Sequence, residues 1–326
     1  MPGADFRDSM HTVLGEVGEL PHLVELPARG PHASMVGRTL SVVTELGIDL
    51  QPAGWRLTDA SGLDHRRAAS LLAQDLDTLE ELMQGRRGSL KLQVTGPWTL
   101  AASVERLRGD KVLADHGARR DLTQALAEGL RGHLGDVRRR VSNVQLVVQV
   151  DEPALSSVLS GSIPTASGFS RHRSVTPADA AQGLDAVCDA VLESEAEPIL
   201  HDCAASVPWA VLRQTRVQAV SFDPSLMGPE QYDDVATWVD AGRSVWLGVI
   251  PSRDPAGRPP SDADVTRAVH SWWSNLGFSD TEKLPPTVVT PSCGLAGASP
   301  TWARNALGMA QRVAQNLSEE HGKMDS

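Results

Sequence analysis

The strongest constraint on the fold of this chain is its alternation of short apolar runs with longer amphipathic stretches. The runs have the length and composition of buried strands, and the longer stretches repeat apolar residues at helical spacing. Strands that alternate with helices pair in parallel, because each helix returns the chain to the start of the next strand. The strand-like runs are Leu90 to Gly96, Val144 to Val150, Pro198 to Cys203, Ala219 to Asp223, Val245 to Ile250 and Thr287 to Thr290, with a weaker one at His22 to Leu26.

Amphipathic segments between these runs predict the helices of an α/β fold, a (β/α)₈ TIM barrel. Helical pattern begins almost at once, near Phe6 to Val17, and only seven good strands follow. The first strand is therefore either missing or irregular, and Trp55 to Thr58 is a candidate for its place. The other expected helices are Asp64 to Gln84, Arg119 to Arg140, Pro177 to Glu195, Pro229 to Ala241 and Asp262 to Leu276.

The length of the chain fits one large barrel or two ordinary domains. It has 326 residues, of which 41% are hydrophobic, and neither an internal repeat nor a low-complexity linker divides it. We therefore predict one barrel domain over residues 1–326. The longest apolar runs are far shorter than the roughly 20 residues of a spanning helix, and the N-terminus does not read as a secretory signal. These features predict a cytoplasmic protein with no membrane partner.

Charge and cysteine content narrow the class of function. The net charge of −11 argues against nucleic acid as a partner, because phosphate binding needs a clustered basic surface. Three cysteines are too few, and odd in number, for a disulfide framework. Cys188 lies among the apolar positions of a helical pattern, so we expect it in the core.

The triplet His201-Asp202-Cys203 ends one strand, and Cys293 follows another. Residues i and i+2 of a strand point the same way, so His201 and Cys203 share a face. Imidazole and thiolate are preferred ligands of zinc, and three protein ligands leave one position open for chemistry. The alternative, that both cysteines are small core residues and His201 is simply hydrogen-bonded, carries about equal weight on these residues alone.

Acidic residues also fall at strand ends. Asp151 follows the buried run Leu146 to Val150, and a buried carboxylate needs a partner, for which a substrate ammonium group is one candidate. Its alternative role is to cap the next helix or brace a loop. In a barrel the carboxyl ends of the strands surround one mouth. Side chains expected there are Glu25, Thr95, Asp151, His201, Cys203, Asp223 and Cys293.

Taken together, these motifs resemble the cobalamin-independent methionine synthase family. The resemblance covers the catalytic C-terminal barrel of that family over nearly the whole chain, without its N-terminal barrel. The motifs that carry it, in order and approximate spacing, are Thr95-Gly96-Pro97, Val150-Asp151-Glu152-Pro153-Ala154-Leu155, His201-Asp202-Cys203 and Pro291-Ser292-Cys293-Gly294-Leu295.

The resemblance implies a zinc-dependent methyltransferase that transfers a methyl group from a methylated folate to the thiol of homocysteine, forming methionine. It implies that His201, Cys203 and Cys293 are zinc ligands and that Asp151 binds the homocysteine amino group. Glu25 lies near the second amino-acid-binding carboxylate of the family. Asp223 stands where the family has a glutamate ligand and is one methylene shorter, so it is the candidate fourth ligand.

The chain differs from the family pattern at other positions, and these differences leave the proton-transfer residue and the methyl donor unassigned. A histidine is expected after the seventh strand, but Gly248 to Arg253 contains none, so no catalytic residue is assigned. Ser103 stands where the family has a folate-stacking tryptophan, and Met1-Pro2-Gly3 is the only candidate remnant of a Gly-Ser motif that holds the substrate carboxylate. Two alternatives follow: a methyltransferase that takes its methyl group from a corrinoid partner protein, and a catalytically silent relative that binds zinc or an amino acid.

Overall fold

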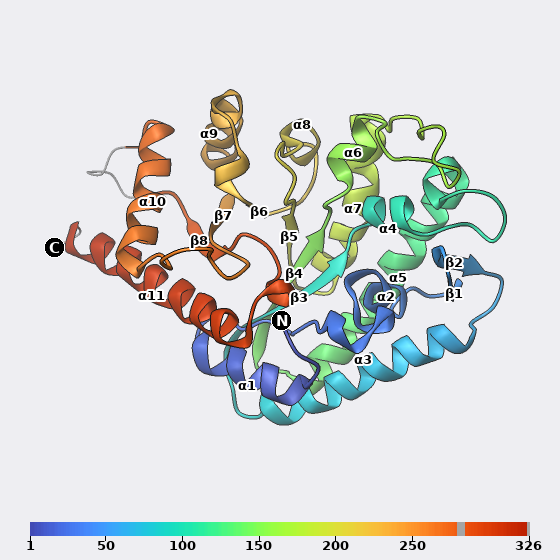
Figure 1. Cartoon of the computed structure of the whole chain (residues 1–326), viewed down its shortest axis with the longest axis horizontal. Coiled ribbons are helices and arrows are strands. Elements are labelled where there is room, and N and C mark those ends of the chain that lie inside the picture. The colour runs from blue at the N-terminus through green and yellow to red at the C-terminus, as the bar shows by residue number, and fades with distance from the viewer. Residues whose placement is uncertain (279–283, 325–326) are drawn as a thin grey trace.

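The centre of the molecule is a curled sheet of six parallel strands, each paired with its neighbours in chain order (Figure 1). The computed structural model describes residues 1–278 and 284–324. Every expected strand except the weak first one is present, with ends within two residues of expectation. The strands are β3 (Gly88–Thr95), β4 (Val144–Asp151), β5 (Glu197–His201), β6 (Ala219–Phe222), β7 (Ser244–Ile250) and β8 (Thr287–Pro291).

Helices cover the outer face of this sheet (Figure 1). Side-chain caps explain several of their starts: Asp115 accepts from the amide of Ala118, and Ser261 forms a capping box with Asp264. The helices are α1 (Phe6–Glu16), α2 (Met35–Leu40), α3 (Leu63–Leu82), α4 (Pro97–Ser103), α5 (His116–Arg140), α6 (Leu155–Leu159), α7 (Pro177–Glu193), α8 (Trp209–Leu212), α9 (Tyr232–Asp240), α10 (Asp262–Asn275) and α11 (Pro300–Met324). None of the described helices is long and apolar enough to cross a membrane.

The helical shell continues from the last helix to the first. α11 packs on α1, α1 packs on α3, and α3 packs on α5, so the first and last helices of the chain lie side by side (Figure 1). The sheet itself has six hydrogen-bonded strands and not eight, but a parallel sheet curled inside a helical layer is TIM-barrel-like. The predicted fold class is therefore confirmed as an α/β, TIM-barrel-like fold.

Alternate residues of the strands face two different cores. Leu90, Leu92 and Val94 of β3 pack outward against the helices in the main core. A second, smaller cluster lies on the other face of the sheet, inside the curl, and we call it the lumen cluster; its members are Val147, Ile199, Ala219 and Trp246, with Leu20 and Val288 packed against them. Because side chains alternate along a strand, the polar residues Asp151, His201 and Ser221 share the lumen face with this cluster.

The N-terminal region differs from expectation. The segment His22 to Leu26 forms one parallel bridge to the sheet, between His22 and Lys91, and is not a full strand. Trp55 to Thr58 does not fill the place of the first barrel strand. It belongs to β2 (Gly54–Thr58), which pairs antiparallel with β1 (Gly47–Gln51) in a separate two-stranded sheet. The turn between them uses Gly54 at φ 127°, a backbone conformation that favours glycine.

Candidate metal and amino-acid site

Three potential metal ligands converge at the carboxyl ends of the strands. One ligand atom from each of His201, Cys203 and Cys293 lies within 4.8 Å of the others. His201 is the last residue of β5, Cys203 lies two residues beyond it, and Cys293 follows β8. Imidazole and thiolate together are the ligand set that zinc prefers, and these donors are close enough to share one ion.

Backbone contacts hold the two ligand-bearing loops. The amide of Asp202 donates to the carbonyl of Ser221 at 3.0 Å, which fixes the Cys203 loop against β6. The amide of Ser292 donates to the carbonyl of Ile250 at 2.9 Å and fixes the Cys293 loop against β7. Gly248 permits this approach, because a Cβ there would lie 2.7 Å from the Cα of Ser292.

Ser221 determines which nitrogen of His201 is available. The hydroxyl oxygen of Ser221 lies 3.1 Å from Nδ1 of His201. This hydrogen bond occupies Nδ1 and leaves Nε2 for a metal, as is usual where a second residue orients a ligating histidine. Ser221 is not among the site residues predicted from the sequence. Its signal is a polar residue on the lumen face of a short, otherwise apolar strand, next to the strand that carries a candidate ligand.

The two thiols interact directly. Hydrogen bonds from Cys203 and His201 lower the pKa of the Cys293 thiol to about 4, whereas the hydrogen bond to Cys293 raises the pKa of Cys203. A thiolate is the form that binds a metal. Cys203 is half-buried and Cys293 is exposed, so the cluster is open to solvent on one side. Cys188 is buried, as expected for a core residue.

Asp151 lies beside the ligand cluster. It is 7% exposed, and its backbone pairs with that of His201 on the neighbouring strand. Burial raises the pKa of Asp151, and the charges of His201 and Lys91 oppose this rise. Its Oδ1 accepts a hydrogen bond from Nε2 of Gln149 at 2.7 Å. Asp151 therefore belongs to β4 and the lumen, and it caps no helix.

Glu25 is the second carboxylate of this region. Burial raises the pKa of Glu25 to about 7; Arg38 lowers it, and the charge of Asp151 raises it further. Nε of Arg38 lies 4.0 Å from Oε1 of Glu25, and that oxygen has no hydrogen-bond partner among the described residues. The charges of Glu25 and Asp151 thus act on each other, and both carboxylates can accept from a cationic ligand.

Asp223 is outside the ligand cluster. Among the described residues, the group that could hold an ion consists of His201, Cys203 and Cys293. Oδ1 of Asp223 instead accepts hydrogen bonds from the amide and the hydroxyl of Ser225, at 2.9 and 2.6 Å. These bonds cap the short turn that follows β6. A metal held by these three residues alone would keep a further position open for a substrate atom.

The Thr95-Gly96-Pro97 motif has a structural role. Glu152 is fully buried and accepts from the amides of Trp98 and Thr99, at 2.9 and 2.8 Å, at the start of α4. A Cβ on Gly96 would lie 2.2 Å from Oε1 of Glu152, so only glycine fits. The indole of Trp98 donates to the carbonyl of Ala180 on α7 and is 5% exposed, so Trp98 packs against helices and is not a stacking platform.

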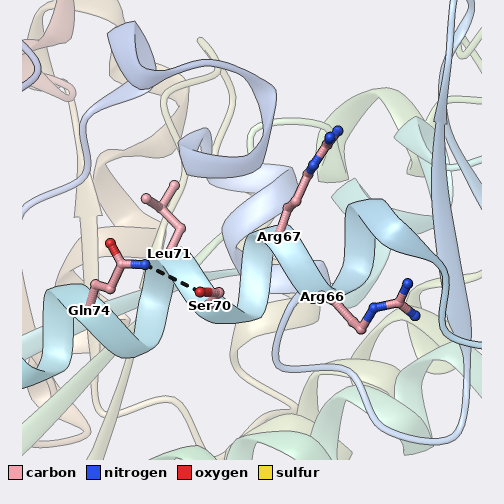
Figure 2. A pocket seen from close by; sticks show the side chains of 5 residues that line it. All are labelled: Arg66, Arg67, Ser70, Leu71 and Gln74. Atoms are coloured by element: carbon pink, nitrogen blue, oxygen red, sulfur yellow. Dashed lines mark hydrogen bonds between the residues drawn. The ribbon is translucent and has the colours of Figure 1, made fainter.

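A shallow surface pocket lies elsewhere, on α3. Figure 2 shows its lining, which comes from one stretch of that helix: Arg66, Arg67, Ser70, Leu71 and Gln74. The side-chain amide of Gln74 donates to the hydroxyl of Ser70 within the same helix. None of the strand-end residues contributes to this pocket, so it is separate from the ligand cluster.

The fold and the site together define a class of protein: a TIM-barrel-like protein with a cluster of thiols and an imidazole at its strand ends. The family model described as "Cobalamin-independent synthase, Catalytic domain" matches residues 79–316. The chain therefore belongs to the cobalamin-independent synthase family, through its catalytic domain, and the resemblance found in the sequence is confirmed. No curated protein matches the chain.

A solved structure shares the fold of this chain. A B12-independent methionine synthase from Shewanella sp. W3-18-1, in complex with selenomethionine, is 13% identical, with a TM-score of 0.59. That match covers 96% of this chain and 88% of the other. An agarase, AgWH50C, is 10% identical with a TM-score of 0.35, over 84% of this chain and 54% of the other, which is too distant to inform the fold.

Proposed function

We propose that this protein is a zinc-dependent methyltransferase that activates the thiol of homocysteine and methylates it with a methyl group from a methylated folate. The observation that carries this proposal is the convergence of His201, Cys203 and Cys293 within 4.8 Å. Membership of the cobalamin-independent synthase family supports the reaction class. The relative from Shewanella was solved with selenomethionine, an amino acid of the size that the proposed site would accept.

Each part of the site has a task in this reaction. The three ligands would hold zinc and leave one position open, and zinc, when bound, keeps a coordinating thiol deprotonated at neutral pH. Asp151 and Glu25 accept hydrogen bonds from the substrate ammonium group and so place its sulfur near the ligands. In the transfer, the sulfur forms a bond to the methyl carbon as the bond from that carbon to the donor nitrogen breaks, and the nitrogen takes up a proton. No residue is assigned to deliver that proton.

Metal content is the first test. Purified protein is expected to contain about one zinc per chain, and Cys203→Ala and Cys293→Ala are each expected to lose it, because two remaining ligands bind zinc poorly. Cys188→Ala is the matched control: its thiol is buried on α7, outside the site, so zinc should remain. Well-folded protein without zinc, or variants at Cys203 and Cys293 that keep it, would contradict the proposal.

Methyl donors are the second test. Zinc-loaded protein is incubated with homocysteine and either a methylated folate or methylcobalamin, and methionine is measured. Product with the folate alone is the expected result. Product with methylcobalamin alone would instead support a corrinoid partner protein. Homocysteine binding without transfer from either donor would support the catalytically silent relative.

A further inference from the structure

A lysine lies inside the curl of the sheet, on the lumen face. Lys91 is flanked in β3 by Leu90 and Leu92, which both pack outward in the main core, so its side chain points to the lumen. Burial lowers the pKa of Lys91, and Asp151 and Glu25 act in the opposite direction. A cation is rare at such a position unless it has polar partners. The cobalamin-independent reaction proposed above does not use Lys91.

Lys91 is the start of a hydrogen-bond chain that ends at Asp151. Its Nζ donates to Oε1 of Gln149 at 3.0 Å, and Nε2 of Gln149 donates to Oδ1 of Asp151 at 2.7 Å. The direction of this chain is fixed by chemistry. An ammonium group can only donate, so the Gln149 amide must turn its oxygen to Lys91 and its NH₂ group to Asp151.

The chain constrains the carboxylate of Asp151. Within the described residues, Asp151 accepts one side-chain hydrogen bond, and it does so at Oδ1. Gln149 and Asp151 lie two positions apart on β4, on the same face, so the Gln149 amide holds the Asp151 carboxylate at Oδ1 and leaves Oδ2 without a side-chain hydrogen bond from the described residues. Cooperative hydrogen bonds of this kind strengthen one another where water is excluded.

We propose that Lys91 is a positioning residue, which acts through Gln149 to orient the Asp151 carboxylate toward the ammonium group of an amino-acid substrate. This inference rests on the proposed function. It assigns to Lys91 and Gln149 the recognition of the α-amino group, as distinct from the thiol, which the metal ligands recognise.

The test compares two thiols that differ only in the ammonium group. Homocysteine and its desamino analogue, a mercaptobutanoate, are titrated calorimetrically into zinc-loaded wild-type protein, Lys91→Met and Gln149→Leu. Each substitution is expected to weaken homocysteine binding about tenfold, the size of one lost hydrogen bond to a charged group, and to leave the analogue unchanged. The double variant should lose no more than either single variant, because both residues act in one chain.

The matched control is Lys111→Met, the other lysine whose side chain the structure describes, which lies before a short turn outside the lumen. It should bind both thiols as wild type does. Equal weakening of both thiols by Lys91→Met and Gln149→Leu would overturn the inference, because that pattern indicates a structural role. Equal affinity of wild-type protein for the two thiols would overturn it and leave thiol activation standing. A wild-type protein that binds neither thiol would overturn the proposed function and this inference together.

Discussion

At the scale of the residue, His201 shows how one hydrogen bond selects a chemical function. Its ring has two nitrogens, and Ser221 lies 3.1 Å from Nδ1. If Nε2 binds the metal, Nδ1 carries the hydrogen and donates a hydrogen bond to the hydroxyl oxygen of Ser221. The serine therefore fixes the tautomer and the orientation of the ligand.

We predict that Ser221→Ala weakens zinc binding about 10- to 100-fold, the usual effect of losing a residue that orients a ligating histidine. Zinc affinity is measured by competition with a chromogenic chelator. Ser225→Ala is the control, because the Ser225 hydroxyl bonds to Asp223, which lies outside the ligand cluster. A loss of affinity in Ser225→Ala as large as that in Ser221→Ala would instead assign Asp223 to the metal.

Glu25 gives a prediction for the dependence of stability on pH. Its folded-state pKa is raised to about 7, mainly by burial, from an ordinary value of 4.5. The folded protein therefore binds more protons than the unfolded chain between these values. The contribution of Glu25 to the free energy of unfolding is full below pH 4.5 and is lost as pH rises through about 7.

In Glu25→Gln this contribution is absent at every pH. As pH rises from 4.5 to 8, wild type should therefore lose stability relative to Glu25→Gln, by up to roughly 3 kcal/mol in the free energy of unfolding. Urea denaturation of both proteins across this pH range measures the difference. Parallel curves for the two proteins across this range would show that Glu25 titrates normally.

At the scale of the element, α5 shows that glycines of one helix have different roles. A Cβ on Gly129 would lie 1.9 Å from the carbonyl oxygen of Val42, so this glycine permits close packing of the helix on the loop after α2. Gly135 is on the exposed side of the same helix, and a Cβ there would meet nothing within 4 Å.

We predict opposite effects for the same substitution at these two positions. Gly135→Ala should stabilise the protein by up to about 1 kcal/mol, because alanine is the better helix former. Gly129→Ala should destabilise it by about 1 to 3 kcal/mol, because the backbone must shift to relieve the contact. Thermal unfolding of the two variants checks this, and similar effects at both positions would contradict the packing of α5 described above.

The sequence patterns predicted the positions of the long helices well. The expected helix Asp64 to Gln84 is α3, and Asp262 to Leu276 is α10, each within two residues. Such segments are long, and their apolar periodicity is a local property. Trp55 to Thr58 was a candidate for the first barrel strand, but it pairs with the neighbouring segment β1 in a separate sheet. Which strand a short segment pairs with is not a local property.

At the scale of the whole molecule, the ligand cluster joins parts of the chain that are far apart in sequence. His201 and Cys203 follow β5, whereas Cys293 follows β8, and β6 and β7 lie between them in the sheet. A metal bound to all three would therefore link β5 to β8 across the two strands that separate them in the sheet. Such a link stabilises the folded state over the unfolded chain, in which the ligands are separated.

We predict that zinc removal lowers the thermal midpoint of unfolding. At a metal concentration about 1,000 times the dissociation constant, binding adds about 4 kcal/mol to the free energy of unfolding. The midpoint is measured by calorimetry for zinc-loaded and chelator-treated protein. Cys293→Ala should unfold at one temperature in both conditions, whereas Cys188→Ala should keep the full difference; a wild-type midpoint that is unchanged by the chelator would contradict the link.

The sequence by itself determined the alternation of strands and helices and the placement of His201 and Cys203 two residues apart where a strand ends, because both are local properties of the chain. The tertiary structure decided the rest. Only the curl of the sheet brings Cys293 to these two residues, and only the pairing of β5 with β6 places Ser221 beside His201. These contacts join strands that are far apart in the chain, so they cannot be predicted from any short stretch of residues.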